Sequence, residues 1–294
     1  MPKSWRHTGR DYLFMDRTLP PGCTEKTVRG DKTLNIILCH LKFSMGPVPE
    51  NMKKLCRAAE LAGKYGADWM VTPEMALQGY YFSKNIFHEK NLFLEKTSYE
   101  KILDPLLSRI RKYRMALFLG AGEKDESGKL FNSLWIFNRE GILCGRHRKA
   151  VIPRGGAEDW AQAGAAPVPV QLDGFVTAPL VCADAWKHEI GVSLAGQGAE
   201  LAVDAAAWAF SSCCPDPVEV WKIFSRNSGL PLIIANQTGK TPWMDMNCAM
   251  SAIIDHGSLH SSYAGAEALL LTHCRRKDHM LQFSPFKIFP FIDQ

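Results

Sequence analysis

The sequence lacks any segment that predicts passage across or into a membrane. Its 294 residues contain no run of about 18 apolar residues, the length from which a membrane-spanning helix is predicted. The first residues, MPKSWRHTGRDYLF, have no apolar stretch of the kind that secretory signals carry. We therefore expect a cytoplasmic protein without a membrane partner.

Cysteine is present, but the patterns that use it in pairs are absent. The nine cysteines are odd in number and irregular in spacing, and no C-x-x-C motif occurs. Such a set is a poor disulfide framework and fits reduced thiols better. His256 and His260 are four residues apart, but the sequence between them is typical of a strand and turn, so we expect no metal site.

Charge of one sign is also scarce. The formal net charge is +5, and 46% of the residues are apolar against 22% charged, which is usual for a globular protein. The densest basic run, Arg146 to Lys149, has no interleaved aromatic residues of the kind that single-strand nucleic-acid binders use. We therefore expect no nucleic-acid partner. No low-complexity tract and no short fixed-period repeat is present.

Strand and helix patterns alternate through most of the chain. Short apolar runs rich in β-branched residues predict strands, and apolar residues three and four positions apart predict helices. The predicted strands are 34–39, 68–74, 115–121, a hairpin over 130–149, 177–185, 200–206, 230–236, 251–260 and 267–273, and the predicted helices are 52–62, 102–113, one through 190–194 and one from 217. The alternation indicates one α/β domain with mixed sheets over residues 33–294, preceded by an extension of residues 1–32.

Three reactive side chains follow predicted strands. They are Glu74, Lys149 and Cys182. In α/β folds, functional residues gather where strands end and loops begin. Taken singly, each has an ordinary structural interpretation: a helix-opening charge for the glutamate, a solvated lysine, and a small buried hydrophobe for the cysteine.

The sequences around these residues carry more information than the residues alone. In chain order they are TPEMALQGYYF around Glu74, LFNSLWIFNREGILCGRHRKAVIP ending at Lys149, and LVCADAW around Cys182, followed by Gly198-Ala199-Glu200-Leu201. These stretches resemble the three signatures of the nitrilase superfamily of carbon–nitrogen hydrolases. The resemblance runs from about Leu34 to Leu271 and implies a four-layer α-β-β-α sandwich.

The resemblance implies a role for each reactive residue. Cys182 is the expected nucleophile and Glu74 the base that takes its proton. Lys149 and the backbone N–H of Ala183 are expected to stabilise the oxyanion. All these groups belong to the protein itself, so no cofactor is needed.

Three further residues are expected at the site with alternatives left open. Glu158 lies where many family members carry a second glutamate that orients the lysine and the substrate, or it is an exposed loop acid. Tyr80 and Trp208 are expected to line the substrate pocket by analogy with the family. For Trp208 the alternative is packing in the core or at an interface.

The sequence departs from the family pattern in ways that bear on the substrate. Members that act on nitriles typically have Cys-Trp-Glu, whereas this chain has Cys182-Ala183-Asp184. The arginine and phenylalanine of the usual run are replaced by Trp186 and Lys187. The run Cys182-Ala183-Asp184 favours hydrolysis of a small-molecule amide through a thioester over nitrile hydrolysis, whereas the changes at Trp186 and Lys187 point to no single subfamily. The alternatives are a nitrilase, an N-carbamoyl hydrolase or an acyltransferase of the same superfamily, or a non-catalytic binding subunit.

The resemblance also implies self-association. Domains of this family usually pair through helices near the active site, so we expect a homodimer or a larger homo-oligomer. The apolar segment Phe283 to Phe291 is suited to lie across a neighbouring subunit, because exposed apolar tails promote aggregation.

Overall fold

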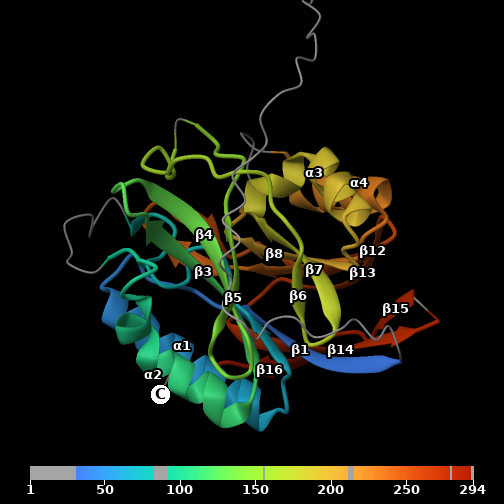
Figure 1. Cartoon of the computed structure of the whole chain (residues 1–294), viewed down its shortest axis with the longest axis horizontal. Coiled ribbons are helices and arrows are strands. Elements are labelled where there is room, and N and C mark those ends of the chain that lie inside the picture. The colour runs from blue at the N-terminus through green and yellow to red at the C-terminus, as the bar shows by residue number, and fades with distance from the viewer. Residues whose placement is uncertain (1–30, 83–91, 155, 211–214, 279, 293–294) are drawn as a thin grey trace, which may run out of the picture.

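Two β-sheets form the centre of the protein. The computed structural model describes residues 31–82, 92–154, 156–210, 215–278 and 280–292. Figure 1 shows the two sheets with helices α1 and α2 on one side of the molecule and helices α3 and α4 on another. The expected extension lies outside the described residues apart from its last two positions.

The first sheet has the strand order β15-β14-β1-β2-β3-β4-β5, with β16 also paired to β14. Its strands are β1 (Lys32–His40), β2 (Trp69–Val71), β3 (Ala116–Lys124), β4 (Leu130–Phe137), β5 (Leu143–Arg148), β14 (Ala268–Lys277), β15 (Met280–Phe283) and β16 (Lys287–Pro290). Strands β1, β2 and β3 are parallel, while β3, β4 and β5 are successively antiparallel. The sheet is therefore mixed, as the alternation in the sequence predicts.

The second sheet has the order β13-β12-β9-β8-β7-β6. Its strands are β6 (Val170–Leu172), β7 (Phe175–Val181), β8 (Leu201–Ala206), β9 (Leu232–Asn236), β12 (Ser251–Asp255) and β13 (Ser258–Tyr263). Strands β7, β8 and β9 are parallel, so their carboxyl ends lie at one edge of the sheet. A separate small hairpin joins β10 (Gly239–Thr241) to β11 (Met244–Met246).

Side-chain alternation along the strands divides the interior into two cores. In β1, Ile36 belongs to the core between the two sheets, whereas its neighbour Ile37 belongs to the core under α1 (Val48–Lys64) and α2 (Tyr99–Tyr113). Helices α3 (His188–Gly196) and α4 (Pro217–Ser228) cover the second sheet. Because strand side chains alternate with period two, each sheet presents one face to the other sheet and the opposite face to its helices. The result is the expected four-layer α-β-β-α sandwich.

The helix boundaries follow from local sequence. In α4, the Asp216 side chain accepts a hydrogen bond from the Val218 N–H at 2.9 Å and caps the helix, with Pro217 in the first turn. The helix ends at Gly229, whose φ of 71° lies in the left-handed region. In the part of the chain that is described, none of the helices is both long and apolar enough to cross a bilayer.

The segment from Phe283 to Phe291 adds to the first sheet, and its expected contact with a neighbouring subunit stays a prediction. It packs on its own chain: β16 pairs with β14, and the Phe289 ring stacks on Tyr65 with centroids 3.8 Å apart. Phe283 and Phe291 are both buried. Strands β15 and β16 both pair with β14 and extend the first sheet, which the aromatic composition of the segment did not indicate.

Candidate active site

The ends of β2 and β5 bring a lysine between two glutamates. Lys149 directly follows β5, and its Nζ lies 2.7 Å from Glu74 Oε1 and 2.6 Å from Glu158 Oε1. At most 1% of any of these three side chains is exposed, so water does not screen their charges. We call Glu74, Lys149 and Glu158 the buried ion cluster.

Glu74 is held at both oxygens and on its backbone. Oε1 also accepts a hydrogen bond from Asn132 Nδ2 at 2.7 Å, and Oε2 accepts one from the Ala207 N–H at 2.9 Å. Strand β3 passes so close to the backbone at Glu74 that a Cβ at Gly120 would lie 2.2 Å from the carbonyl oxygen of the preceding residue, Pro73. Burial raises the pKa of Glu74 to about 7, with Glu158 adding to the rise and Lys149 opposing it. A carboxyl with this pKa can both accept and return a proton near neutral pH.

Lys149 keeps its proton despite its burial. Burial lowers the pKa of a lysine, but the carboxylates of Glu158 and Glu74 outweigh that effect and hold the pKa of Lys149 well above its ordinary value. Glu158 Oε1 also accepts a hydrogen bond from the Tyr80 hydroxyl at 2.6 Å. Since Glu158 is 1% exposed, its interpretation as an exposed loop acid is wrong.

Cys182 occupies a strained turn at the end of β7. Its φ is 49°, a left-handed conformation that costs a residue with a Cβ roughly 1–2 kcal/mol. It opens the short 3-10 helix Cys182–Trp186. Burial, and then the charge of Glu74, hold the pKa of the thiol well above its ordinary value, against the opposing charge of Lys149. Cys182 is therefore a thiol at neutral pH and needs a base to become a nucleophile.

Asp184 joins the Cys182 turn to the end of β5. Its Oδ1 accepts hydrogen bonds from the N–H groups of Ala150 and Val151, both at 2.9 Å. Its Oδ2 is 3.0 Å from the Val181 N and 2.7 Å from His147 Nε2. Burial alone would raise the pKa of Asp184, but His147 and the backbone donors lower it overall. This ionised carboxylate fixes the cysteine turn against the strand that precedes Lys149.

The remaining predicted site residues lie near the cluster in different ways. Ala183 is the second residue of the 3-10 helix, where backbone N–H groups precede the helix's own hydrogen bonds. Trp208 follows Ala207 in the chain and packs between Trp186 and Trp221, with ring centroids 5.7 and 5.6 Å away. The core-packing interpretation of Trp208 is confirmed, and its role in lining a pocket stays a prediction.

Two buried polar residues at the site are not among those predicted from the sequence. Asp204 Oδ1 accepts the Cys182 N–H at 2.6 Å, and Gln237 Nε2 donates to the Glu74 carbonyl oxygen at 2.8 Å. Asp204 left a signal, because an aspartate in the apolar strand LAVDAA is rarely buried without a partner. The sequence around Gln237 gives no such indication, since many loop residues follow the end of a strand.

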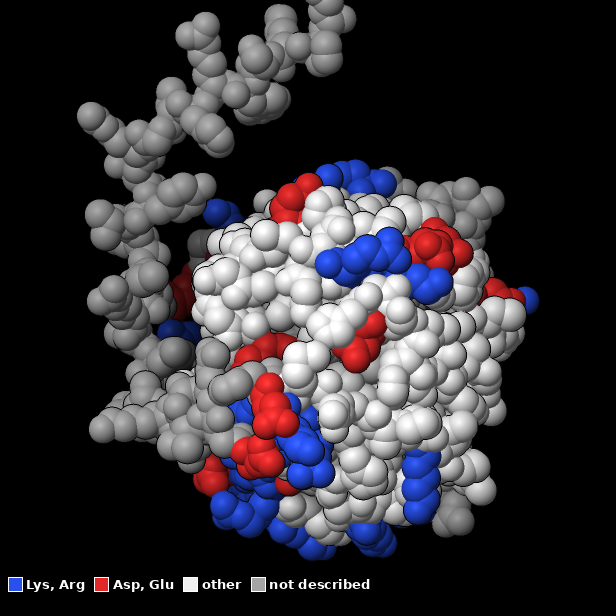
Figure 2. Space-filling model, turned by 90° about the vertical axis from the view of Figure 1, so that its right-hand side faces the viewer, with Lys and Arg blue, Asp and Glu red and all other residues white. Residues whose placement is uncertain are grey.

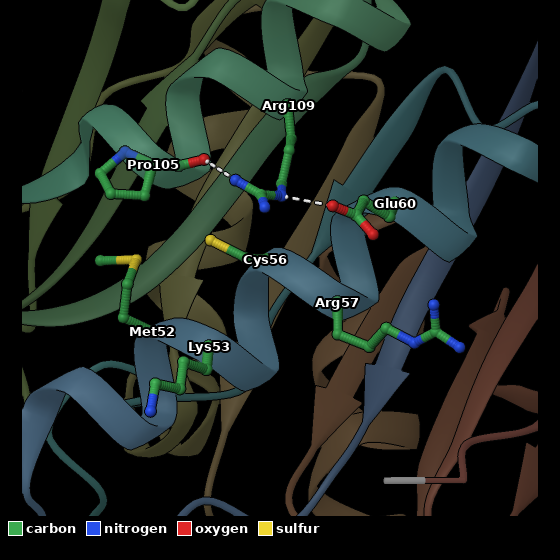
Figure 3. Close-up of a pocket in the computed structure, with 7 residues that line it drawn as sticks. All are labelled: Met52, Lys53, Cys56, Arg57, Glu60, Pro105 and Arg109. Carbon is green, nitrogen blue, oxygen red and sulfur yellow. Dashed lines mark hydrogen bonds and ion pairs between the residues drawn. The ribbon is translucent and has the colours of Figure 1, made fainter. Parts of the chain in front are cut away.

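A surface pocket of about 350 Å³ lies apart from this site, between α1 and α2. Figure 3 shows the Cys56 sulfur pointing toward α2, beside the ion pair of Arg109 with Glu60. We call it the α1–α2 pocket; its lining residues are Met52, Lys53, Cys56, Arg57, Glu60, Pro105 and Arg109. Among the described residues, no group of three or more His, Cys, Asp and Glu side chains is arranged to hold a metal ion.

The sequence profile of the family described as carbon-nitrogen hydrolase matches residues 45–268. A curated relative, the glutamine-dependent NAD(+) synthetase of Rhodobacter capsulatus, is 27% identical over 169 residues, which are 56% of this chain and 29% of the relative. The chain thus spans less than a third of the length of that relative.

Solved structures share the fold at low sequence identity. Nit3 of Saccharomyces cerevisiae, a member of branch 10 of the nitrilase superfamily, superposes with a TM-score of 0.72 at 16% identity, covering 84% of this chain and 91% of that chain. A mutant amidase from Nesterenkonia sp. AN1, with acrylamide added to its active-site cysteine, gives a TM-score of 0.71 at 18% identity, covering 81% and 92%. These likenesses show the nitrilase fold.

Proposed function

The chain belongs to the carbon-nitrogen hydrolase family, and from this premise we propose that it hydrolyses a small-molecule linear amide through a thioester on Cys182. The products are a carboxylic acid and ammonia or an amine. The observation that carries the proposal is the buried ion cluster beside a cysteine in a left-handed turn. The cluster and Cys182, whose charge interactions place them together, supply a base, a cation and a nucleophile that are buried from bulk solvent.

In the first half of the proposed reaction, Glu74 takes the proton of the Cys182 thiol. The sulfur attacks the amide carbonyl carbon, a C–S bond forms, and the carbonyl oxygen takes up the electron pair. Lys149 and the Ala183 N–H stabilise this oxyanion. The intermediate then collapses as Glu74 returns the proton to the departing nitrogen, and the C–N bond breaks to leave a thioester.

In the second half, water replaces the amine. Glu74 takes a proton from the water, whose oxygen attacks the thioester carbonyl. The C–S bond then breaks to release the acid, and Glu74 returns the proton to the departing sulfur to restore the thiol. A carboxyl with a pKa of about 7 suits both directions of transfer. An amine in place of water gives acyl transfer, so the same residues allow a transferase.

Glu158 and Tyr80 support Lys149 in this scheme. The Glu158 carboxylate balances the lysine charge, and the Tyr80 hydroxyl holds that carboxylate. Lys149 therefore stays protonated while Glu74 alternates between its two forms. We propose Tyr80 and Trp208 as residues of the substrate pocket.

Two observations guide the choice of substrate. Amidases are among the structural neighbours, which favours simple aliphatic amides. The curated relatives are glutamine-dependent by name, which favours the side-chain amide of glutamine as a second candidate.

The test is ammonia release from propionamide, glutamine, N-carbamoyl-β-alanine and propionitrile, with wild type and Cys182→Ala run in parallel. Release from propionamide or glutamine by wild type alone supports the proposal. Release from the nitrile or the carbamoyl compound alone moves the chain to another branch of the family. Equal release by both proteins removes Cys182 as the nucleophile.

We also propose that the chain forms a homodimer or a larger homo-oligomer. The right-hand side of Figure 1, where α4, β13 and β15 lie, faces the viewer in Figure 2 and carries broad areas without charged residues. Exposed apolar side chains on these elements include Ile223, Leu259 and Met280. Light scattering during size-exclusion chromatography measures the molar mass, and a mass of one chain contradicts this proposal.

A further inference from the structure

A buried carboxyl holds the backbone of the candidate nucleophile. Asp204 lies in the middle of β8, opposite Leu180 in the parallel pairing with β7. It is fully buried, and its Oδ1 accepts the Cys182 N–H at 2.6 Å. The two residues are 22 positions apart in the chain, so the contact joins two strands.

The hydrogen bond from the Cys182 N–H to Asp204 restrains an unusual backbone conformation. As the first residue of a 3-10 helix, Cys182 has an N–H that the helix itself cannot satisfy. Its φ of 49° persists only where the surroundings fix it. The Asp204 oxygen provides that restraint, and the direction of the Cys182 sulfur depends on it.

The other oxygen of Asp204 points to its protonation state. Oδ2 is buried and has no hydrogen-bond partner within the described part of the chain. A buried carboxylate is costly unless both oxygens are satisfied, whereas a protonated acid buries no charge. Burial raises the pKa of Asp204 well above its ordinary value, as do Asp184 and Glu74, against the Cys182 N–H and Lys149.

We propose that Asp204 is a positioning residue that acts as a neutral carboxylic acid, holding the Cys182 N–H through Oδ1 without adding a negative charge beside the nucleophile. The proposal rests on the assignment of Cys182 above. A charge at Asp204 would oppose formation of the Cys182 thiolate, as the charge of Glu74 already does. A neutral acid orients the turn and leaves Lys149 to act on the sulfur unopposed from this side.

The two aspartates beside the cysteine offer a matched pair of variants. Asp184 accepts several donors and is ionised, so in Asp184→Asn the amide NH₂ faces N–H groups and we expect a less stable protein. Asp204 accepts one donor, so in Asp204→Asn the amide oxygen still takes the Cys182 N–H. Asp204→Leu keeps the approximate size but removes the acceptor.

The measurement is the alkylation rate of Cys182 by iodoacetamide across pH, followed by peptide mass mapping of the full chain, with ammonia release measured beside it. We expect the alkylation rate of Cys182 in Asp204→Asn to have the same pH midpoint as in wild type. In Asp204→Leu we expect kcat for ammonia release to fall by about 10–100-fold with little change in KM. Restoration of kcat by asparagine but not by leucine separates positioning from general packing.

Three results overturn the proposal. A midpoint lowered by about one unit or more in Asp204→Asn shows that the wild-type residue is charged. Equal kcat in Asp204→Leu and wild type shows that the contact does not position the cysteine. Loss of kcat in Asp204→Asn as large as in Asp204→Leu shows that an acceptor alone is not enough. The Asp204→Asn variant tests the charge state of Asp204 even if Asp204→Leu does not fold. Alkylation of Cys182 needs no substrate, so its outcome is separate from the proposed function.

Discussion

The α1–α2 pocket and the buried ion cluster both place an acid and a cation near a cysteine. In the pocket, Cys56 lies on a regular helix beside the ion pair of Arg109 with Glu60. Each side chain of that pair is 33% exposed. Water therefore screens both charges, and the ion pair has little power to change the chemistry of the thiol.

The cluster differs in burial and in backbone. The side chains of Lys149 and Glu74 are fully buried, and Cys182 sits in a left-handed turn. Burial raises the pKa of Glu74 to about 7, with Glu158 adding to the rise and Lys149 opposing it. From this comparison we infer that a thiol, an acid and a cation form a reactive set where the fold buries them and fixes the sulfur.

The largest expected difference concerns the two cysteines. Cys182→Ala should lower kcat on the order of 10⁴-fold or more, because no nucleophile remains, whereas Cys56→Ala should leave kcat within about twofold. Ammonia release from the best substrate of the panel measures both. Similar losses in the two variants would remove the distinction between the two regions.

The two glutamates form the next pair. Glu74→Gln should lower kcat by about 10²–10⁴-fold, since the amide cannot shuttle a proton. Glu60→Gln, which loses only a partly exposed ion pair, serves as the control and should keep wild-type kcat. Full activity in Glu74→Gln would mean that another group is the base.

The two cations should differ in their effect on stability. Lys149→Met leaves Glu74 and Glu158 buried without a cation and should lower the free energy of unfolding by about 3–5 kcal/mol. Arg109→Met should lower it by no more than about 1 kcal/mol, because its partner is partly solvated. Urea denaturation at pH 7.5 compares them, and equal losses would contradict the role of burial.

The smallest effect is a pH dependence that only the cluster should show. Activity should rise with pH and level off above about pH 7, as Glu74 loses its proton. Stability should change in the opposite sense. The folded protein binds more protons than the unfolded chain between the ordinary Glu pKa of 4.5 and about 7, so the contribution of Glu74 is lost as pH rises through that window.

The control for this pH dependence is Glu74→Gln, in which the stability change over the same window should shrink. Glu60→Gln should leave both curves at their wild-type positions. A stability that rises across the window because of Glu74 would contradict a raised pKa at this residue.

Much of the fold could be predicted from the sequence because its strands are apolar and its helices amphipathic. The hairpin of β4 and β5, with Asn138 to Gly141 at its turn, is one case. The short strands β15 and β16 could not be predicted, since their pairing depends on the exposed edge of β14 rather than on their own pattern.

Part of the candidate site could be predicted, because Glu74 and Cys182 follow strands inside recognisable sequence stretches. The supporting contacts could not be predicted. Asp204 meets the Cys182 N–H only because β7 and β8 are parallel neighbours, and Gln237 reaches Glu74 from the opposite sheet. Such contacts depend on the packing of two sheets, which no local pattern contains.

The most direct test of the central claim is to trap the intermediate. Wild-type protein is mixed with the best amide of the panel, quenched in acid during turnover, digested and analysed by peptide mass mapping. The account predicts an added acyl mass on the peptide that contains Cys182 and none on the peptide that contains Cys56. Turnover with no acyl mass on Cys182, or with the acyl mass on another residue, would contradict it.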